Sequence, residues 1–248
     1  MASSAADYQP AWLLHSRPYR ETSALAWLLT LEEGRVDAVV RGVRSRKSRY
    51  RALLQPFTPL QVNLKGHHQL RTLVGLESTS APHWFQGEAL VCGLYANELL
   101  SRLLLPGQAC ADLFRDYSLL LNLLSNAEQR EPALRRLEFT LLETLGYAPA
   151  WQSATGETLV ADWYYSYRSE EGFVPCLPTE SGRSGQPVFT GAQLLAIAAD
   201  DWRLAATRQA GKHLTRQLLQ PLLGQRPLQS RQLFKQLVKN PSRSKLSE

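Results

Sequence analysis

A short basic run is the part of this sequence whose side chains most clearly suggest a chemical task. Residues 41–51 contain six cations and no acid: Arg41, Arg44, Arg46, Lys47, Arg49 and Arg51. The chain has 28 Lys and Arg against 22 Asp and Glu, so these six equal its whole formal net charge of +6. Because guanidinium groups present paired N–H donors that match phosphate oxygens, the run predicts contacts with a phosphate backbone. An ordinary solvated loop or a localisation-type run is the alternative interpretation.

Other basic positions could extend such a surface. Arg35 precedes the run on a predicted strand, and Lys212 and Arg216 lie on a predicted helix near the C-terminus. For the two helical residues taken singly, ordinary surface charge is the slightly favoured interpretation. We include all three with the run as candidate nucleic-acid contacts.

Catalytic patterns are absent from the sequence. It contains no Gly-rich phosphate loop and no Gly-x-Ser-x-Gly elbow, and the adjacent residues His67 and His68 fall on a predicted turn. The three cysteines, Cys92, Cys110 and Cys176, are scattered, which predicts free thiols in a reducing cytoplasm. We therefore expect no catalytic residue, no cofactor and no metal. A binding protein is favoured over an enzyme, although an enzyme with dispersed residues stays open.

The basic run interrupts a region with the texture of β-structure, residues 1–80. Val36, Ala38 and Val40 alternate with Asp37, Val39 and Arg41, which is typical of a strand with one buried face. Five short strands are predicted, at residues 11–16, 23–31, 35–42, 60–65 and 69–77. A small five-stranded barrel of the oligonucleotide/oligosaccharide-binding (OB) type fits this count, and an SH3-like barrel fits nearly as well.

The remainder, residues 81–248, is predicted to be a helical domain, so the fold class is α+β. Leucines recur at helical spacing, with Pro132 expected in the first turn of one helix and Thr190 expected to cap another. An irregular, aromatic-rich insertion near 147–189 should form a small β excursion, and residues 240–248 should fray. No long apolar run or signal peptide is present, so we expect no membrane contact and a cytoplasmic location.

Several motifs, taken together and in order, resemble the RecO family of bacterial recombination mediators. Two occur in the helical half, Arg135-Arg-Leu-Glu-Phe and Leu145-Gly-Tyr-Ala-Pro149. The others are residues 14–23, Gly34-Arg35, residues 40–43, 53–60, 212–223 and 227–234.

The resemblance implies an N-terminal OB barrel followed by a helical domain. It implies a nucleoid-associated protein that binds single- and double-stranded DNA and anneals complementary strands. It also implies contact with the C-terminal tail of single-strand-binding protein, and pairing with RecR to load RecA. Some members of the family hold zinc through four cysteines after the Gly-Tyr-x-Pro motif. Residues 151–157 contain no cysteine here, so we expect aromatic side chains to hold this segment.

The helical domain is expected to bind the tail of single-strand-binding protein, which the resemblance implies to end in acids around a Phe and a free carboxylate. Such a ligand needs an apolar slot beside a guanidinium. Arg135 and Arg136 are about 100° apart on a helix, so at most one should face the core, and Phe139 and Leu142 could form the slot. An RNA-binding or ribosome-associated OB protein, and a nucleic-acid enzyme, are the rival functions.

Overall fold

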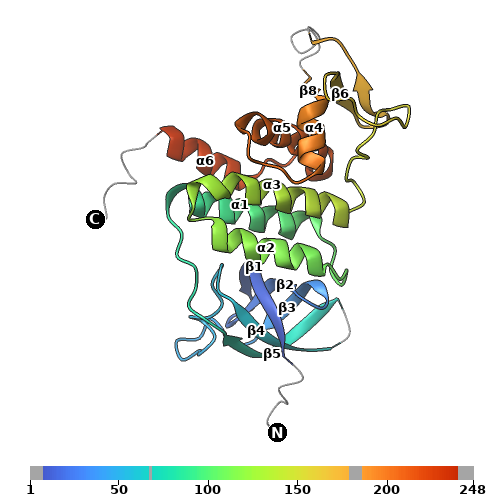
Figure 1. Cartoon of the computed structure of the whole chain (residues 1–248). Helices are drawn as coiled ribbons and strands as arrows, with labels where there is room; N and C mark the ends of the chain where they lie inside the picture. Colours follow the sequence, from blue (N-terminus) through green and yellow to red (C-terminus); the bar gives the residue numbers. More distant parts are fainter. Residues whose placement is uncertain (1–7, 67–68, 179–185, 240–248) are drawn as a thin grey trace. The chain divides into compact units, whose positions relative to one another are not determined.

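Five strands close into a barrel in the N-terminal part of the computed structural model, which describes residues 8–66, 69–178 and 186–239 (Figure 1). The strands are β1 (Gln9–Tyr19), β2 (Ser23–Thr30), β3 (Gly34–Val40), β4 (Leu60–Lys65) and β5 (Leu70–Ser78). Around the barrel the order is β1-β2-β3-β5-β4, and β3 runs parallel to β5. This order is that of an OB barrel, which confirms the predicted fold. The predicted turn at His67 and His68 and the predicted fraying at residues 240–248 lie outside the described residues.

Small and medium apolar side chains fill the barrel. Val36, Ala38 and Val40 are at most 4% exposed, whereas Asp37 and Val39 are half-buried, so the predicted alternation is confirmed. Such a narrow interior suits alanine and valine, because a five-stranded barrel leaves little room between facing walls.

The chain divides into two compact units, and the division does not coincide with the end of the barrel. One contains the described residues up to Arg130 and those from Arg226 on, and the other is Glu131–Gln225.

Two helices of the first unit, α1 (Gly87–Leu103) and α2 (Ala111–Leu123), pack on the outside of β1. The indole Nε1 of Trp12 donates to Ser118 Oγ at 2.9 Å. Buried Asn97 accepts from the Tyr117 hydroxyl and donates to the carbonyl of Leu13 at 3.5 Å. These polar contacts inside an apolar interface fix which residue of each helix faces the strand, because a buried donor without a partner costs about 1–3 kcal/mol.

The C-terminal helix α6 (Gln229–Lys239) belongs to the same unit through its N-terminus. The carboxylate of Glu98 on α1 accepts from the backbone N–H groups of Gln229 and Ser230, both at 2.9 Å, and from the Ser230 hydroxyl at 2.7 Å. A carboxylate at this position satisfies unpaired N–H groups and complements the positive end of the helix dipole.

The second unit contains most of α3 (Ala127–Thr144), a three-stranded sheet and two further helices. Their bounds are β6 (Tyr164–Arg168), β7 (Gly172–Pro175), β8 (Val188–Thr190), α4 (Gly191–Ala198) and α5 (Ala205–Leu223). The sheet, in the order β7-β6-β8, is the predicted β excursion. Trp151 lies 5.9 Å from Phe173 and 5.7 Å from Phe139 between ring centroids, so aromatic packing links the irregular segment to both β7 and α3.

Two helix starts test the sequence prediction. Thr190 caps α4 as predicted, in a reciprocal capping box with Gln193. The prediction for Pro132 was wrong, because α3 begins at Ala127 and Pro132 lies inside it. Asn126 caps the start of α3 instead, since its side-chain oxygen accepts from the backbone N–H of Glu128 at 3.0 Å.

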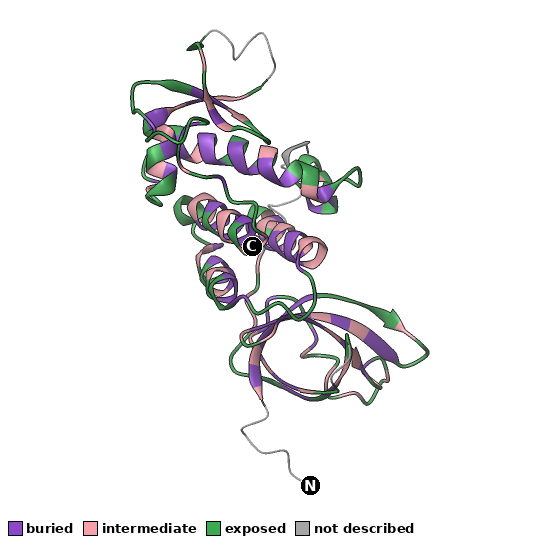
Figure 2. Cartoon of the chain, turned by 90° about the vertical axis from the view of Figure 1, so that its right-hand side faces the viewer, coloured by how far each residue is buried: buried purple, intermediate pink, exposed green. Residues whose placement is uncertain are grey.

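The helices bury one side each, and Figure 2 shows the buried residues as stripes along them.

A buried ion pair lies inside the second unit. Arg135 on α3 donates to Glu138 at 2.8 Å and to the hydroxyl of Thr215 on α5 at 3.2 Å. The side chains of Arg135 and Glu138 are 7% and 1% exposed. The next residue, Arg136, is 43% exposed and pairs with Asp200 at the surface. Of the two adjacent arginines, Arg135 is therefore the one that faces the core.

Replacing Arg135 with Met should destabilise the protein by about 3–5 kcal/mol, because it removes one member of a buried ion pair. Arg136→Met is the matched control, and it should cost about 0–1 kcal/mol because that pair is exposed to water. Urea denaturation followed by circular dichroism measures both. Equal midpoints for the two variants would contradict the assignment.

The protein should also fold without metal. No group of three or more His, Cys, Asp or Glu that could hold a metal ion occurs among residues 8–66, 69–178 and 186–239. We expect a chelator to leave the melting temperature unchanged, since no binding energy would be lost from the folded state. Stoichiometric zinc in the purified protein, removed together with the fold, is the opposite outcome.

Candidate nucleic-acid interface

The predicted basic run forms the first part of the long connection between β3 and β4, residues 41–59, which we call the basic loop. It is built from successive turns and is fastened by apolar side chains rather than by regular structure. Val43 and Leu54 belong to the barrel core, and Tyr50 and Leu53 pack against it. Val43, Tyr50, Leu53 and Leu54 therefore fasten the loop to the barrel core, and its charged residues are left outside.

Two cations of the loop are engaged in holding it. The backbone N–H of Arg44 donates to Thr22 at 2.8 Å, and its guanidinium donates to the carbonyls of Arg20 and Glu21 at 3.2 and 3.3 Å. Arg49 covers the ring of Tyr50 at 4.9 Å and donates to its hydroxyl at 3.0 Å. Both arginines thus use part of their N–H donors in hydrogen bonds within the protein.

The other four cations point to solvent without compensation. Arg41, Arg46, Lys47 and Arg51 are exposed, and none of their side chains forms an ion pair with a residue that the structure describes. Several other exposed arginines do have acid partners, such as Arg115 with Asp112 and Arg168 with Glu171. A cluster of uncompensated charge is an attractive site for a polyanion, because binding releases the polyanion's counterions.

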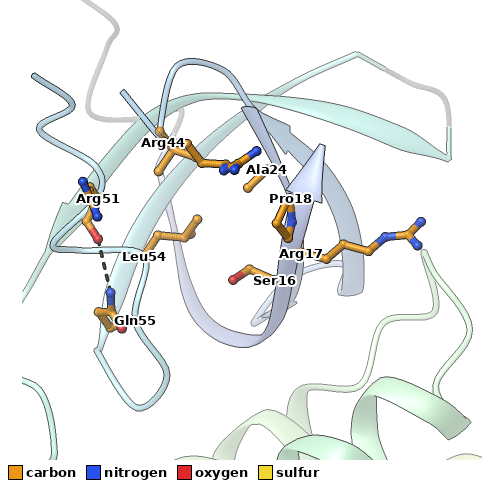
Figure 3. Close-up of a pocket in the computed structure, with 9 residues that line it drawn as sticks. Ser16, Arg17, Pro18, Ala24, Arg44, Arg51, Leu54 and Gln55 are labelled. Carbon is orange, nitrogen blue, oxygen red and sulfur yellow. Dashed lines mark hydrogen bonds between the residues drawn. The ribbon is translucent and has the colours of Figure 1, made fainter. Parts of the chain in front are cut away.

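Two hollows flank the end of the β1–β2 hairpin beside this loop. The inner hollow, about 350 Å³, lies against the barrel core, since Ala24, Val43 and Leu54 form part of both. Figure 3 shows the side chain of Arg44 reaching toward Ala24, with Arg51 and Gln55 on one side and Arg17 extending away on another. The complete lining is Ser16, Arg17, Pro18, Ala24, Val43, Arg44, Arg51, Leu54 and Gln55.

The outer hollow, about 460 Å³, lies on the other face of the same strands. Val39 points into it, whereas the next residue, Val40, points into the barrel. The complete lining is Tyr19, Arg20, Thr22, Ser23, Val39, Arg41, Gly42 and Thr72. No acid lines either hollow, and five arginines line the two together.

Aromatic rings near the hollows are covered by side chains of the protein itself. The guanidinium of Arg20 lies 5.2 Å from the ring centre of Tyr19. Trp27 on β2 stacks on His15 at 4.5 Å, and the guanidinium of Arg35 lies 5.4 Å from its ring. Burial, and secondarily the charge of Arg17, lower the pKa of His15 and so favour the neutral form of this ring.

Arg35 has an internal role that the sequence did not indicate. Its guanidinium forms a two-point ion pair with Asp37 and donates to the carbonyls of Ser101 and Leu104, both at 2.9 Å. These carbonyls end α1, so the arginine satisfies the last turn of the helix and complements its dipole. Only 13% of its side chain is exposed, and we do not include it in the proposed surface.

The remaining predicted residues all lie in the second unit. Lys212 and Arg216 are exposed on α5, four residues apart, so they share one side of the helix. Arg136 is at the surface, and Phe139 is half-buried against Trp151 and Trp202.

Two of the residues predicted to bind the tail are interior. Arg135 is held by the buried pair described above, and Leu142 is 0% exposed, so the structure offers neither to a ligand.

Sequence reasoning missed Arg17 and Arg20, which line the two hollows. A signal for them existed. Successive antiparallel strands place the turn after β1 beside the end of β3, and Ala24 is indeed opposite Val40. Arginines next to the first hairpin turn must therefore lie near the start of the basic loop.

No helix among residues 8–66, 69–178 and 186–239 combines the length and apolar character that crossing a bilayer requires.

Two family models match the chain. Recombination protein O N terminal matches residues 8–81, and Recombination protein O C terminal matches residues 85–232.

Relatives that align over nearly their whole length support the match. The chain is 44% identical to DNA repair protein RecO of Cellvibrio japonicus, over 92% of this chain and 96% of the relative. It is 42% identical to DNA repair protein RecO of Stutzerimonas stutzeri, over 96% and 97%. The counterpart from Erwinia tasmaniensis is 40% identical, over 93% and 94%. With both halves matched by the family's models and by these relatives, the protein belongs to the RecO family.

Proposed function

We propose that this protein is a DNA-binding recombination mediator that anneals complementary single strands and acts without catalytic turnover. The observation that carries the proposal is the basic loop, which presents four uncompensated cations on an OB barrel. Its membership of the RecO family, whose relatives are named as DNA repair proteins, supports DNA as the polyanion.

Annealing places a physical demand that this surface can meet. Two single strands repel each other through their phosphates, and this repulsion must be reduced before their bases can pair. Cations that neutralise phosphates release counterions and reduce the repulsion without contacting the base edges. Neither proton transfer nor a bound cofactor is needed, which agrees with hollows whose polar lining side chains are arginines, hydroxyl groups and one amide.

The proposed role in the cell includes protein partners. We propose that the protein works at the nucleoid in the cytoplasm, binds the tail of single-strand-binding protein, and joins RecR to help load RecA on coated DNA. The tail site is proposed beside Arg136, whose guanidinium is the exposed one of the adjacent pair. Phe139, between Trp151 and Trp202, supplies the nearest half-buried aromatic surface of the same helix.

Neutralising the four uncompensated cations, Arg41, Arg46, Lys47 and Arg51, should weaken binding to all DNA sequences alike. Each phosphate contact on a single strand contributes about 0.7 to the slope of log affinity against log salt, so the slope should fall by about 3. Fluorescence anisotropy with labelled oligonucleotides between low and moderate salt measures it. Arg115→Ala is the matched control, because this exposed arginine is already paired with Asp112.

An unchanged slope in the quadruple variant would contradict the proposed DNA surface. A strand competition with RNA of the same length completes the measurement. If RNA displaces DNA at much lower concentration, the alternative of an RNA-binding OB protein is favoured instead.

Charge reversal at Arg136 should abolish binding of an acidic peptide that ends in Phe and a free carboxylate. Arg136→Glu removes the charge-assisted hydrogen bonds to the carboxylate and adds repulsion. Calorimetry with the peptide, beside a DNA titration, should show lost peptide binding and unchanged DNA binding. Arg168→Glu is the control, because this exposed arginine of the same unit is already paired with Glu171. Full peptide affinity in Arg136→Glu would move the site elsewhere, with residues 212–231 the next segment to test.

A further inference from the structure

We propose that the inner and outer hollows hold backbone phosphates of a single strand, and that the bases of this strand face solvent. The inference rests on the proposed DNA binding and specifies which part of the strand the surface recognises. Two independent observations carry it: the chemistry of the hollow linings and the covering of the nearby rings.

Both linings combine apolar residues with polar side chains, and every one of these polar side chains can donate a hydrogen bond to an anion. The outer hollow combines the guanidinium groups of Arg20 and Arg41 with the hydroxyls of Thr22, Ser23 and Thr72. The inner hollow combines arginines with Ser16 and the amide of Gln55. With no carboxylate in either lining, nothing there repels a phosphate. A phosphate oxygen only accepts, so it can use the arginine donors and the hydroxyl donors of these linings together.

The rings around the hollows are poorly placed to stack with bases. A base that approached Tyr19 or Tyr50 on the covered face would have to displace the guanidinium of Arg20 or Arg49. Trp27 is in contact with both His15 and Arg35, and Arg35 is held by Asp37 and by the end of α1. OB proteins that grip unpaired bases do so on open aromatic faces. Here a guanidinium group lies over one face of each of these three rings.

Phosphate recognition with free bases has a direct consequence for annealing. Bases that are not stacked on the protein stay available to a complementary strand, while neutralised phosphates let that strand approach. Trp84, which is 85% exposed between β5 and α1, is an open ring of the first unit that could act in the opposite way. The test therefore has to separate phosphate contacts from stacking on Trp84.

The decisive comparison uses two strands of equal length and charge, an oligothymidylate and an oligomer of abasic deoxyribose phosphates. If phosphates alone are recognised, the full-length protein should bind both within about threefold, with the same salt dependence. Stacking is worth about tenfold or more for each stacked base, so an abasic strand bound more than tenfold more weakly would overturn the inference. A protein that binds neither strand would contradict the proposed function itself.

Variants test the two hollows separately. Arg20→Ala in the outer hollow and Arg51→Ala in the inner hollow should each weaken both strands by the same factor, and each should lower the salt slope by about 0.7. Trp84→Ala should change neither strand's affinity. A loss confined to the oligothymidylate in Trp84→Ala would show that the bases are stacked there and would overturn the inference. Circular dichroism confirms that each variant is folded.

Fluorescence of 2-aminopurine placed within the oligothymidylate reports on the bases directly. Because stacking quenches this base, its emission should stay near the value of the free strand when the protein binds. Strong quenching on binding, relieved in Trp84→Ala, is the result that would contradict bases facing solvent.

Discussion

The burial of a few apolar residues under a strongly charged segment is the interaction on which the proposed surface depends. Six cations within eleven residues repel one another, yet Val43 and Leu54 hold their segment against the barrel core. Burying such a side chain contributes about 1.5–3 kcal/mol, whereas two charges 4 Å apart in water repel by about 1 kcal/mol, and less with distance and salt. The burial of these apolar side chains therefore outweighs the repulsion between neighbouring cations. It keeps the charges concentrated at one end of the barrel rather than letting the loop extend.

Arginine serves two physical purposes in this protein, and burial distinguishes them. Arg35 and Arg135 are almost enclosed, and each satisfies several acceptors: Arg35 the last carbonyls of α1, and Arg135 the carboxylate of Glu138 with the hydroxyl of Thr215. A guanidinium suits such sites because its five donors lie in one rigid plane. The uncompensated cations of the basic loop have no comparable contact with a residue that the structure describes, which leaves their donors available to a ligand.

Arg44 and Arg49 stand between these two classes. Both are exposed, and both also bind their own chain, Arg44 through the carbonyls of the first hairpin turn and Arg49 through Tyr50. The contacts of Arg44 draw the loop against the hairpin, and the two hollows lie on either side of this junction. A binding surface of this kind is partly preorganised, so less conformational entropy is lost when a ligand orders it.

The sequence by itself determined the barrel, the helical region and the segment that carries the charge. Strand alternation at Val36–Val40 and helical leucine spacing are local patterns that report which face is buried, and both survive in the structure. Helix starts were predictable where a local signal acts, as at Thr190, but Pro132 misled because a proline fits several positions near a helix start and Asn126 was the actual cap. The predicted boundary at residue 80 marks the end of the barrel. The compact units nevertheless divide near residues 130 and 225, because Trp12, Asn97 and Glu98 form contacts between elements far apart in sequence.

Only the tertiary structure decided which arginines are free. Arg35 and Arg41 look alike in the sequence, and the acceptors that engage Arg35 come from a helix more than sixty residues away. No local pattern reports such a partner, because it depends on how distant elements pack.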